Sequence, residues 1–409
     1  MPNLLPILSL ISLAAAIFIG CWRRVNIGLL SIGFAFLIGC FGADLPPTRI
    51  VSGWPLRLFF MLLGMTLLFG IAAGNGTLSL LAGRCVAITR GRTRLLPPVF
   101  FLLAGVLAAV GPGNIAICAL LLPIALTVAS ERKISPLLMA TMVIAGANAG
   151  GLSPIAPTGI IGVTLARESG LEIGWMVFTR QIIGQSIMAA TLYMVFGGFR
   201  LPNQPRVASE DRPPFRFPQW ATLVILAGVV FAVIAGRWDL GLTAFSGAVI
   251  LLLLRAAEEK SAMNAVPWST LVLVCGVGML VSTVQEVGGI DLLTRLLARG
   301  MTGSTAAPIM ALIGGTLSVV SSASGVVMPT LIPTAAGLAV EVGANPARII
   351  SAIIIGAHVV TNSPISTLGA LAIASAGPAV DRDRLFRNLL ALALAGLVYA
   401  ALLVYVGIV

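Results

Sequence analysis

The chain has 409 residues, of which 58% are hydrophobic and only 10% are charged. Apolar stretches of membrane-spanning length recur along the chain, which indicates a polytopic membrane protein and excludes a soluble two-domain protein. The net charge of +11 could suggest a nucleic-acid partner. The basic residues instead lie in short loops between apolar stretches, where they set membrane topology, so we expect a lipid bilayer as a partner and no nucleic acid.

Apolar stretches in chain order predict an all-α protein with membrane spans at 4–21, 26–43, 57–78, 136–166, 174–198, 219–235, 240–254, 268–285, 347–376 and 388–407. The first stretch has no basic leader and is followed by Arg23-Arg24, which favours a retained span over a cleaved signal peptide. The polar, proline-rich segment 200–218 is predicted to be a cytoplasmic linker. The five cysteines are scattered without metal-binding spacing, and we interpret them as small buried hydrophobes.

Two copies of one unit are visible in the sequence. Ser153-Pro154-Ile155 recurs as Ser363-Pro364-Ile365, 210 residues later, and the same spacing relates Pro123 to Pro333. We therefore predict one repeat over 1–199 and a second over 219–409. Internal duplication with paired, interrupted apolar segments is typical of secondary transporters.

Two further apolar stretches, 97–129 and 305–340, are predicted to be re-entrant helical hairpins. With the N-terminus outside, most lysines and arginines become cytoplasmic only if 97–129 enters from that side and returns to it, because basic clusters flank it. The repeat then predicts that 305–340 enters from outside. Five spans per repeat is an odd number, so the second copy is inverted and both termini lie outside. Between them, 290–299 has the pattern of an amphipathic interfacial helix.

Polar or glycine-rich breaks interrupt both hairpins and two spans, at 111–114, 148–158, 321–325 and 358–367. At such a break, amide N–H groups at the start of one half-helix favour a carboxylate, and carbonyl groups at the end of another favour a cation. Glycine, proline and serine can also serve only packing or kinking in membrane helices. Four breaks at repeat-equivalent positions favour a binding site, because packing does not require the same irregularity twice.

Three motifs carry a resemblance to a known family: Gly20-Cys21-Trp22-Arg23-Arg24-Val25-Asn26-Ile27-Gly28, Asn75-Gly76-Thr77, and Gly146 to Ile155. The chain resembles the bacterial malonate and dicarboxylate carriers (MatC-type), in the ion-transporter superfamily that contains the divalent-anion sodium symporters. The resemblance covers essentially the full length. It implies a scaffold that carries a mobile transport domain, elevator-type movement, a homodimer, and a place in the bacterial cytoplasmic (inner) membrane.

The resemblance also implies site residues. The symporters carry Ser-Asn-Thr at each hairpin tip, where this chain has Gly113-Asn114-Ile115 and Ala323-Ser324-Gly325. Substrate contacts are expected at Asn114, Ile115, Pro157, Thr158, Ser324, Gly325, Ser366 and Thr367. Cation contacts are expected at Gly113, Asn114, Asn148, Ala156, Ala323, Ser324, Asn362 and Ser363. No organic cofactor is expected, and Na⁺ at the hairpin tips is a possible coupling ion.

His358 is the only histidine and is the repeat partner of Asn148. A lone histidine in an apolar span is either a structural residue whose hydrogen bonds are satisfied or a proton-coupling group. Both interpretations stay open.

These features predict a secondary active transporter that imports a small organic dianion, malonate or a C4 dicarboxylate, coupled to Na⁺ or H⁺. An exporter or exchanger of an organic anion or drug is the alternative within the superfamily. A membrane enzyme is disfavoured, because HExxH, GxSxG and paired intramembrane aspartates do not occur in the sequence. The hairpin pair argues against a passive channel, and counterflow would discriminate the two.

Overall fold

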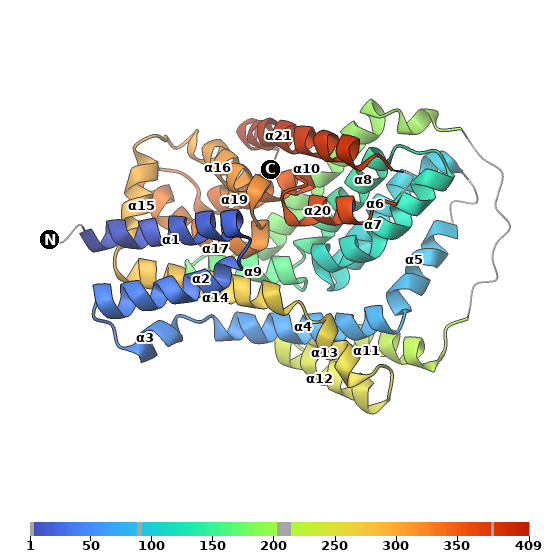
Figure 1. The fold of residues 1–409 in the computed structure, drawn as a ribbon, viewed down its shortest axis with the longest axis horizontal. Coiled ribbons are helices and arrows are strands. Elements are labelled where there is room, and N and C mark those ends of the chain that lie inside the picture. The colour runs from blue at the N-terminus through green and yellow to red at the C-terminus, as the bar shows by residue number, and fades with distance from the viewer. Residues whose placement is uncertain (1–3, 88–91, 203–213, 378–379, 409) are drawn as a thin grey trace.

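The computed structural model describes residues 4–87, 92–202, 214–377 and 380–408, and every regular element in these ranges is a helix. Figure 1 shows an elongated bundle in which the longer helices run lengthwise. Within the described ranges, eight segments are long and apolar enough to cross a membrane: Leu4–Arg23, Leu56–Gly74, Thr93–Val110, Gly113–Glu131, Trp268–Glu286, Ala323–Val342, Pro346–Ala374 and Arg382–Val406. The expectation of an all-α, multi-pass membrane protein is thereby confirmed.

The first half contains α1 (Leu4–Arg23), α2 (Ile27–Phe36), η1 (Leu37–Gly42), α3 (Pro47–Ser52), α4 (Leu56–Gly74), α5 (Thr77–Ala87), η2 (Thr93–Leu95), α6 (Leu96–Val110), α7 (Gly113–Glu131), α8 (Pro136–Gly151), α9 (Pro157–Glu168), α10 (Gly174–Val195) and η3 (Gly198–Arg200). The second half contains α11 (Phe217–Ile234), α12 (Leu240–Leu253), α13 (Glu259–Ala265), α14 (Trp268–Glu286), α15 (Gly289–Ala298), α16 (Ala306–Val320), η4 (Ala323–Val327), α17 (Met328–Leu331), η5 (Ile332–Thr334), α18 (Ala335–Val342), α19 (Pro346–Val359), η6 (Val360–Asn362), α20 (Thr367–Ala374) and α21 (Arg382–Val406).

Side-chain caps fix where several of these helices begin. The side chains of Asn26, Ser135, Asp239, Asn345 and Asp381 each accept a hydrogen bond from a backbone N–H of the first helical turn. These N–H groups have no partner inside their own helix, so a polar residue at this position stabilises the helix start. In this way the apolar segments begin at defined positions despite their uniform hydrophobicity.

One span that was predicted as continuous is divided into two helices. The sequence suggested a single helix over 57–78, but α4 ends at Gly74 and α5 begins at Thr77. The Asn75 side chain accepts hydrogen bonds from the Thr77 backbone N–H and hydroxyl, and Gly76 has φ +80°. This turn chemistry overrides the apolar surroundings. The linker predicted over 200–218 also ends earlier, because α11 begins at Phe217, and its 203–213 part lies outside the described residues.

Glycines let the two halves approach closely. A Cβ atom added at Gly64 in α4 would collide with the carbonyl oxygen of Gly241 in α12. One added at Gly276 in α14 would collide with the carbonyl oxygen of Gly28 in α2. The third predicted span of each half therefore packs against the second span of the other half at backbone contact distance, as small residues allow in membrane helices.

A second pair of glycine contacts repeats at the 210-residue spacing. A Cβ atom at Gly146 in α8 would meet the carbonyl oxygen of Phe101 in α6, and one at Gly356 in α19 would meet that of Ala311 in α16. In each half, the first helix of the interrupted span, α8 or α19, therefore packs against the first helix of the predicted hairpin, α6 or α16. The contact is made at repeat-equivalent glycines.

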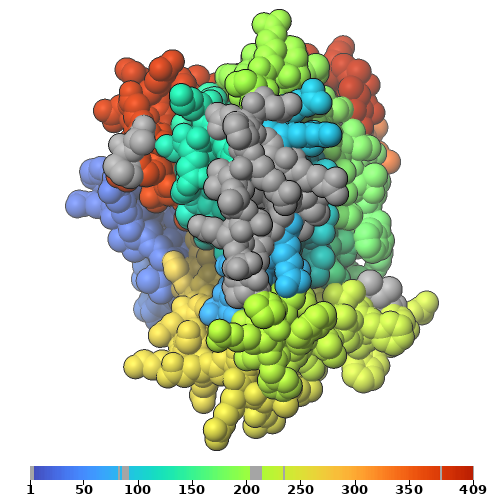
Figure 2. Space-filling model, turned by 90° about the vertical axis from the view of Figure 1, so that its right-hand side faces the viewer, coloured from blue at the N-terminus to red at the C-terminus, as the bar shows by residue number. Residues whose placement is uncertain are grey.

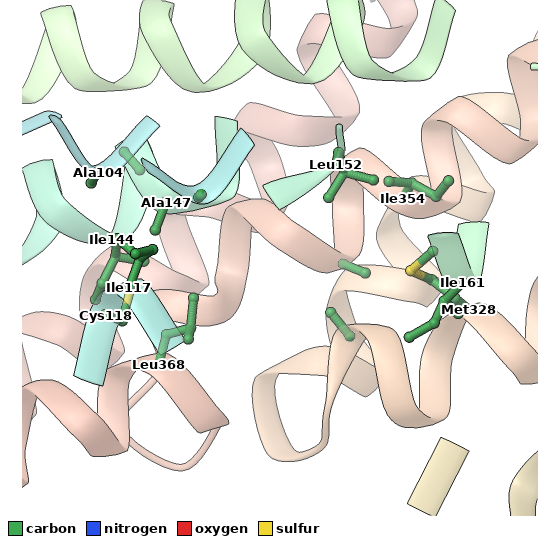
Figure 3. Close-up of a cluster of buried hydrophobic side chains, with 14 of the residues drawn as sticks. Ala104, Ile117, Cys118, Ile144, Ala147, Leu152, Ile161, Met328, Ile354 and Leu368 are labelled. Atoms are coloured by element: carbon green, nitrogen blue, oxygen red, sulfur yellow. The ribbon is translucent and has the colours of Figure 1, made fainter. Parts of the chain in front are cut away.

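Helices from both halves form one core. Figure 1 places α6 and α7 towards the right of the view, where α5 also lies, and α15 at the left. Figure 2 looks onto the right-hand end, with the yellow-green and yellow of α11–α13 along its lower part. In Figure 3, Ile117 of α7 and Ile144 of α8 lie near Leu368 of α20, while Ile161 of α9 lies near Met328 of α17. The buried apolar residues therefore join the two halves.

Candidate functional site

A cavity of about 360 Å³ lies between α4, the α6–α7 tip, and the first turns of α9 and α14. This volume is within the range of small-molecule sites, roughly 300–1,000 Å³. Its walls are mostly apolar, and the described residues that line it include no charged side chain. Its polar side chains are Thr66, Asn114, Thr158, Thr270 and Ser324.

Glycines shape the tip between α6 and α7. Gly111 has φ +152° and Gly113 has φ +77°, conformations that residues with a Cβ rarely adopt. A Cβ at Gly111 would also collide with the ring of Phe69 on α4. The tip is therefore held against α4, and α7 begins at the cavity wall.

Three helix starts converge on this cavity. Residues from the first turns of α7, α9 and α14 line it, namely Gly113 to Ala116, Pro157 with Thr158, and Thr270 with Leu271. Each helix start carries a partial positive charge. At α14, however, the N–H groups of Trp268, Thr270 and Leu271 already donate to the carbonyl oxygens of Val266 and Pro267. At α7 the Ile115 N–H donates to Asn114 Oδ1 at 3.0 Å, so the N–H groups that remain for a ligand belong to α7 and α9. With no carboxylate among its described lining residues, the cavity favours an anion without using an arginine or lysine.

Asn114 is bonded to both helices of the first interrupted span, α8 and α9. Its Nδ2 donates to Asn148 Oδ1 at 2.9 Å, and its Oδ1 accepts from Thr158 Oγ1 at 3.0 Å. Asn148 Nδ2 in turn donates to the His358 carbonyl oxygen at 3.0 Å and to Thr361 Oγ1 at 2.7 Å. A buried hydrogen-bond chain thus runs from the α7 start, through α8, to the end of α19. These bonds use one of the two Asn114 amide hydrogens, so the other is free to donate to a ligand.

The second half contributes Thr270 and Leu271 of α14 to the cavity, and its predicted hairpin contributes Ser324. Ser363 Oγ donates to the Val319 carbonyl oxygen at 2.7 Å, and Ser366 Oγ donates to that of Ser321 at 2.9 Å. Both serines therefore tie the second interrupted span to the end of α16 and do not face the cavity. Asn362 is almost fully buried, and its Oδ1 has no hydrogen-bond partner in the described part of the chain.

The predicted site residues separate into two groups. Those that line the cavity are Gly113, Asn114, Ile115, Pro157, Thr158 and Ser324. Those that lie behind it or beside it are Asn148, Ala156, Ala323, Gly325, His358, Asn362, Ser363, Ser366 and Thr367. Sequence reasoning missed Thr66 and Phe69 on α4 and Thr270 on α14, because a residue in an apolar span carries no signal of the helix face on which it lies.

His358 is fully buried near the meeting point of the halves. Its Nδ1 lies 2.8 Å from the Ile354 carbonyl oxygen. A carbonyl only accepts, so the neutral ring carries its proton on Nδ1, and Nε2 is an acceptor. Within the described residues Nε2 has no hydrogen-bond partner.

A second cavity, of about 640 Å³, lies at the α3 end of α4. It is lined by Val274, Gly278, Val281, Ser282 and Gln285 of α14. Each of these follows by 212 residues an α4 residue of the first cavity, namely Leu62, Thr66, Phe69, Gly70 and Ala73. Arg57 and Glu168 make this second cavity the more polar one.

Comparison with known families gives one match. Residues 1–151 match the family model "Dicarboxylate carrier protein MatC N-terminus". The resemblance inferred from the sequence is confirmed over these residues. No curated protein sequence matches the chain.

Solved structures share the fold. The YdaH transporter of Alcanivorax borkumensis, described as having an unusual topology, aligns with a TM-score of 0.61 and 15% identity over 88% of this chain and 87% of its own. MtrF of Neisseria gonorrhoeae, described as illuminating a class of antimetabolite efflux pumps, aligns with a TM-score of 0.58 and 16% identity over 88% of this chain and 82% of its own. The family match and the shared fold indicate a non-enzymatic membrane transport protein.

Proposed function

We propose that the protein is a secondary active transporter that imports a small organic dianion, malonate or a C4 dicarboxylate, across the bacterial cytoplasmic membrane together with Na⁺ or H⁺. The observation that carries this proposal is the convergence of three helix starts on a cavity without charged lining residues. Backbone N–H groups at helix starts bind carboxylates and can release them again, since no fixed cation holds the anion. The match of residues 1–151 to a dicarboxylate carrier family supports the same substrate class.

The hydroxyl and amide groups of the cavity would orient the two carboxylates. The remaining amide hydrogen of Asn114 and the hydroxyls of Ser324 and Thr270 are the side-chain donors available to the anion. The Thr66 hydroxyl already donates to the Leu62 carbonyl oxygen at 2.7 Å. Thr158 already donates to Asn114, so it acts on the substrate by positioning that amide.

Alternating access follows from the duplication. The glycine contacts repeated at the 210-residue spacing and the two cavities related at the 212-residue spacing support two inverted repeats with re-entrant hairpins. In this proposal each cavity opens to one side of the membrane, and the hairpins and interrupted spans move together, as in an elevator. We also propose that the working unit is a homodimer.

The coupling ion has three candidate positions, two for Na⁺ and one for a proton. The carbonyl oxygen of His358 and the hydroxyl of Thr361 are oxygen ligands of the kind that suit Na⁺, but in the structure the Asn148 amide donates to both. Na⁺ there would require this amide to turn away. The unpartnered Oδ1 of Asn362 supports a cation site in the second half, and the unpartnered Nε2 of His358 supports coupling to a proton.

The test is transport in liposomes. The purified protein is reconstituted, and uptake of radiolabelled malonate and succinate is measured with an inward Na⁺ gradient, an inward H⁺ gradient, or neither. We expect uptake above protein-free liposomes that is driven by one of the gradients. Accumulation of label by counterflow, which a pore cannot produce, would separate the carrier from a channel.

Variants test the site itself. Asn114→Ala and Ser324→Ala are expected to raise the KM for the dianion, whereas Asn264→Ala, at an exposed position in α13, should leave it unchanged. Unchanged KM in both cavity variants would overturn the assigned binding groups. Failure of the wild-type protein to take up either acid under any gradient, with outward movement of organic anions instead, would replace import by the exporter alternative.

A further inference from the structure

Two arginines lie close together where the two halves of the chain meet. Arg180 on α10 donates through Nη1 to Ser351 Oγ on α19 at 3.2 Å. Ser351 lies one helical turn after Arg348, whose Nη2 donates to the Val404 carbonyl oxygen near the end of α21 at 2.8 Å. Both arginines are half-buried. Their guanidinium groups therefore lie at the junction of α10, α19 and α21.

No carboxylate of the described residues at this junction balances the two charges. The salt bridges among the described residues join Arg49 to Glu286, Arg57 to Asp239 and Arg167 to Glu172, and none involves Arg180 or Arg348. The sequences of α10 and α19 contain no aspartate or glutamate, and the only one in α21, Asp383, lies near its opposite end. Two half-buried like charges are unfavourable by themselves and favour an anion between them.

The exposed side chains near this junction change along the helices from aromatic to aliphatic, as expected across one leaflet of a bilayer. Trp175 at the start of α10 and Tyr405 at the end of α21 are exposed at the same end of the molecule as the arginines. Further along the two helices the exposed side chains are aliphatic, such as Ile183 on α10 and Val398 on α21. Tryptophan and tyrosine prefer the membrane–water interface, and aliphatic side chains face the acyl chains.

Direct contacts show that α10 and α21 are neighbours, so these exposed strips lie side by side. Tyr399 of α21 donates its hydroxyl to the Gly184 carbonyl oxygen of α10 at 2.7 Å. Arg348 contacts Val404, whereas a Cβ at Gly396 would lie 3.1 Å from the Val359 side chain, so α19 and α21 run antiparallel. An apolar strip thus leads from the arginines towards the membrane centre.

We propose that the junction of α10, α19 and α21 binds the phosphate of an anionic phospholipid, with Arg180 and Arg348 as the phosphate ligands and the acyl chains along the aliphatic strip. Arginine is well suited to this group, because its planar fork can bond two phosphate oxygens at once. Arg180 belongs to the first half and Arg348 to the second, so the lipid would hold the two halves together. The proposal does not depend on which substrate is transported.

Lipid titration of the purified, delipidated protein tests this site. Phosphatidylglycerol and phosphatidylcholine are added separately, bound lipid is counted by native mass spectrometry, and the thermal midpoint is followed. We expect phosphatidylglycerol to bind and to raise the midpoint. In Arg180→Gln/Arg348→Gln its affinity should fall about thirtyfold, because each of the two basic side chains contributes about 1 kcal/mol to binding anionic lipid. Arg295→Gln/Arg299→Gln, a charge-matched pair on α15, should bind like the wild type.

A second variant separates lipid binding from folding. Arg180→Lys/Arg348→Lys keeps both charges and should retain most of the phosphatidylglycerol affinity while it loses the bidentate geometry. Equal lipid affinity in the wild-type and glutamine variants would overturn the proposal. Stabilisation by inorganic phosphate or malonate without any effect of phosphatidylglycerol would also overturn it, since the site would then bind a free anion.

Discussion

At the scale of single residues, Asn148 connects the parts of the site. Its side chain accepts a hydrogen bond from the Asn114 amide and donates hydrogen bonds to the His358 carbonyl oxygen and the Thr361 hydroxyl. Asn148 and His358 are 210 residues apart, so positions that the repeat makes equivalent are in direct contact. All four residues are buried, where hydrogen bonds are strengthened and an unpaired polar group is costly.

Asn148→Ala is therefore expected to lower the free energy of unfolding by about 2–4 kcal/mol, because it removes these bonds and leaves buried partners unpaired. The loss should appear as a lower thermal midpoint of the purified protein. Asn264→Ala is the matched control, at an exposed asparagine in α13. If the two variants unfold at the same temperature, the chain from Asn114 to α19 does not stabilise the protein.

At the scale of helices, two glycine crossings set how the interrupted spans lie on their partners. Gly146 and Gly356 bring α8 onto α6 and α19 onto α16 at backbone contact. A methyl group there meets carbonyl oxygen, which cannot move aside as a flexible side chain can. Such overpacking forces the helix axes apart.

Gly146→Ala and Gly356→Ala should each destabilise the protein by about 1–3 kcal/mol or more, as overpacking of a tight core does. Gly228→Ala on α11 is the matched control, because no atom lies within 4 Å of the added Cβ. Thermal unfolding of the three purified variants measures the effect. A Gly228→Ala loss as large as the other two would show that helix propensity or expression, and not the crossing, is responsible.

The same elements show what the sequence could predict. Ser-Pro-Ile at 153–155 and 363–365 predicted the interruptions, because proline lacks an N–H donor and the residue before it avoids helical geometry. Indeed α8 ends at Gly151 and α19 at Val359. The turn at Asn75-Gly76 was missed, because two residues in an apolar window do not change its mean hydropathy. The cavity walls on α4 and α14 depend on packing between distant segments, which one sequence does not encode in any local pattern.

At the scale of the whole molecule, the two cavities fit alternating access by symmetry. The first cavity lies at the end of α4 that is next to α5. The second lies at the end of α4 that is next to α3, and it is lined by the α14 residues that are repeat-equivalent to the α4 residues of the first cavity. A helix pair related by an inverted repeat runs in opposite directions, so equivalent residues reach opposite sides of the membrane. Ala73 of α4 and Gln285 of α14 are such a pair, and both are exposed.

Cysteine labelling can decide this arrangement. In a background without the native cysteines, Gln285→Cys is expected to react with a membrane-impermeant maleimide added outside intact cells, and Ala73→Cys only in inside-out vesicles. Val398→Cys, at an exposed apolar position well inside α21, should react from neither side. Labelling of both cavity positions from the same side would contradict the inverted repeat. If the proposed dianion binds in the first cavity, it should slow labelling at Ala73→Cys, which lines that cavity.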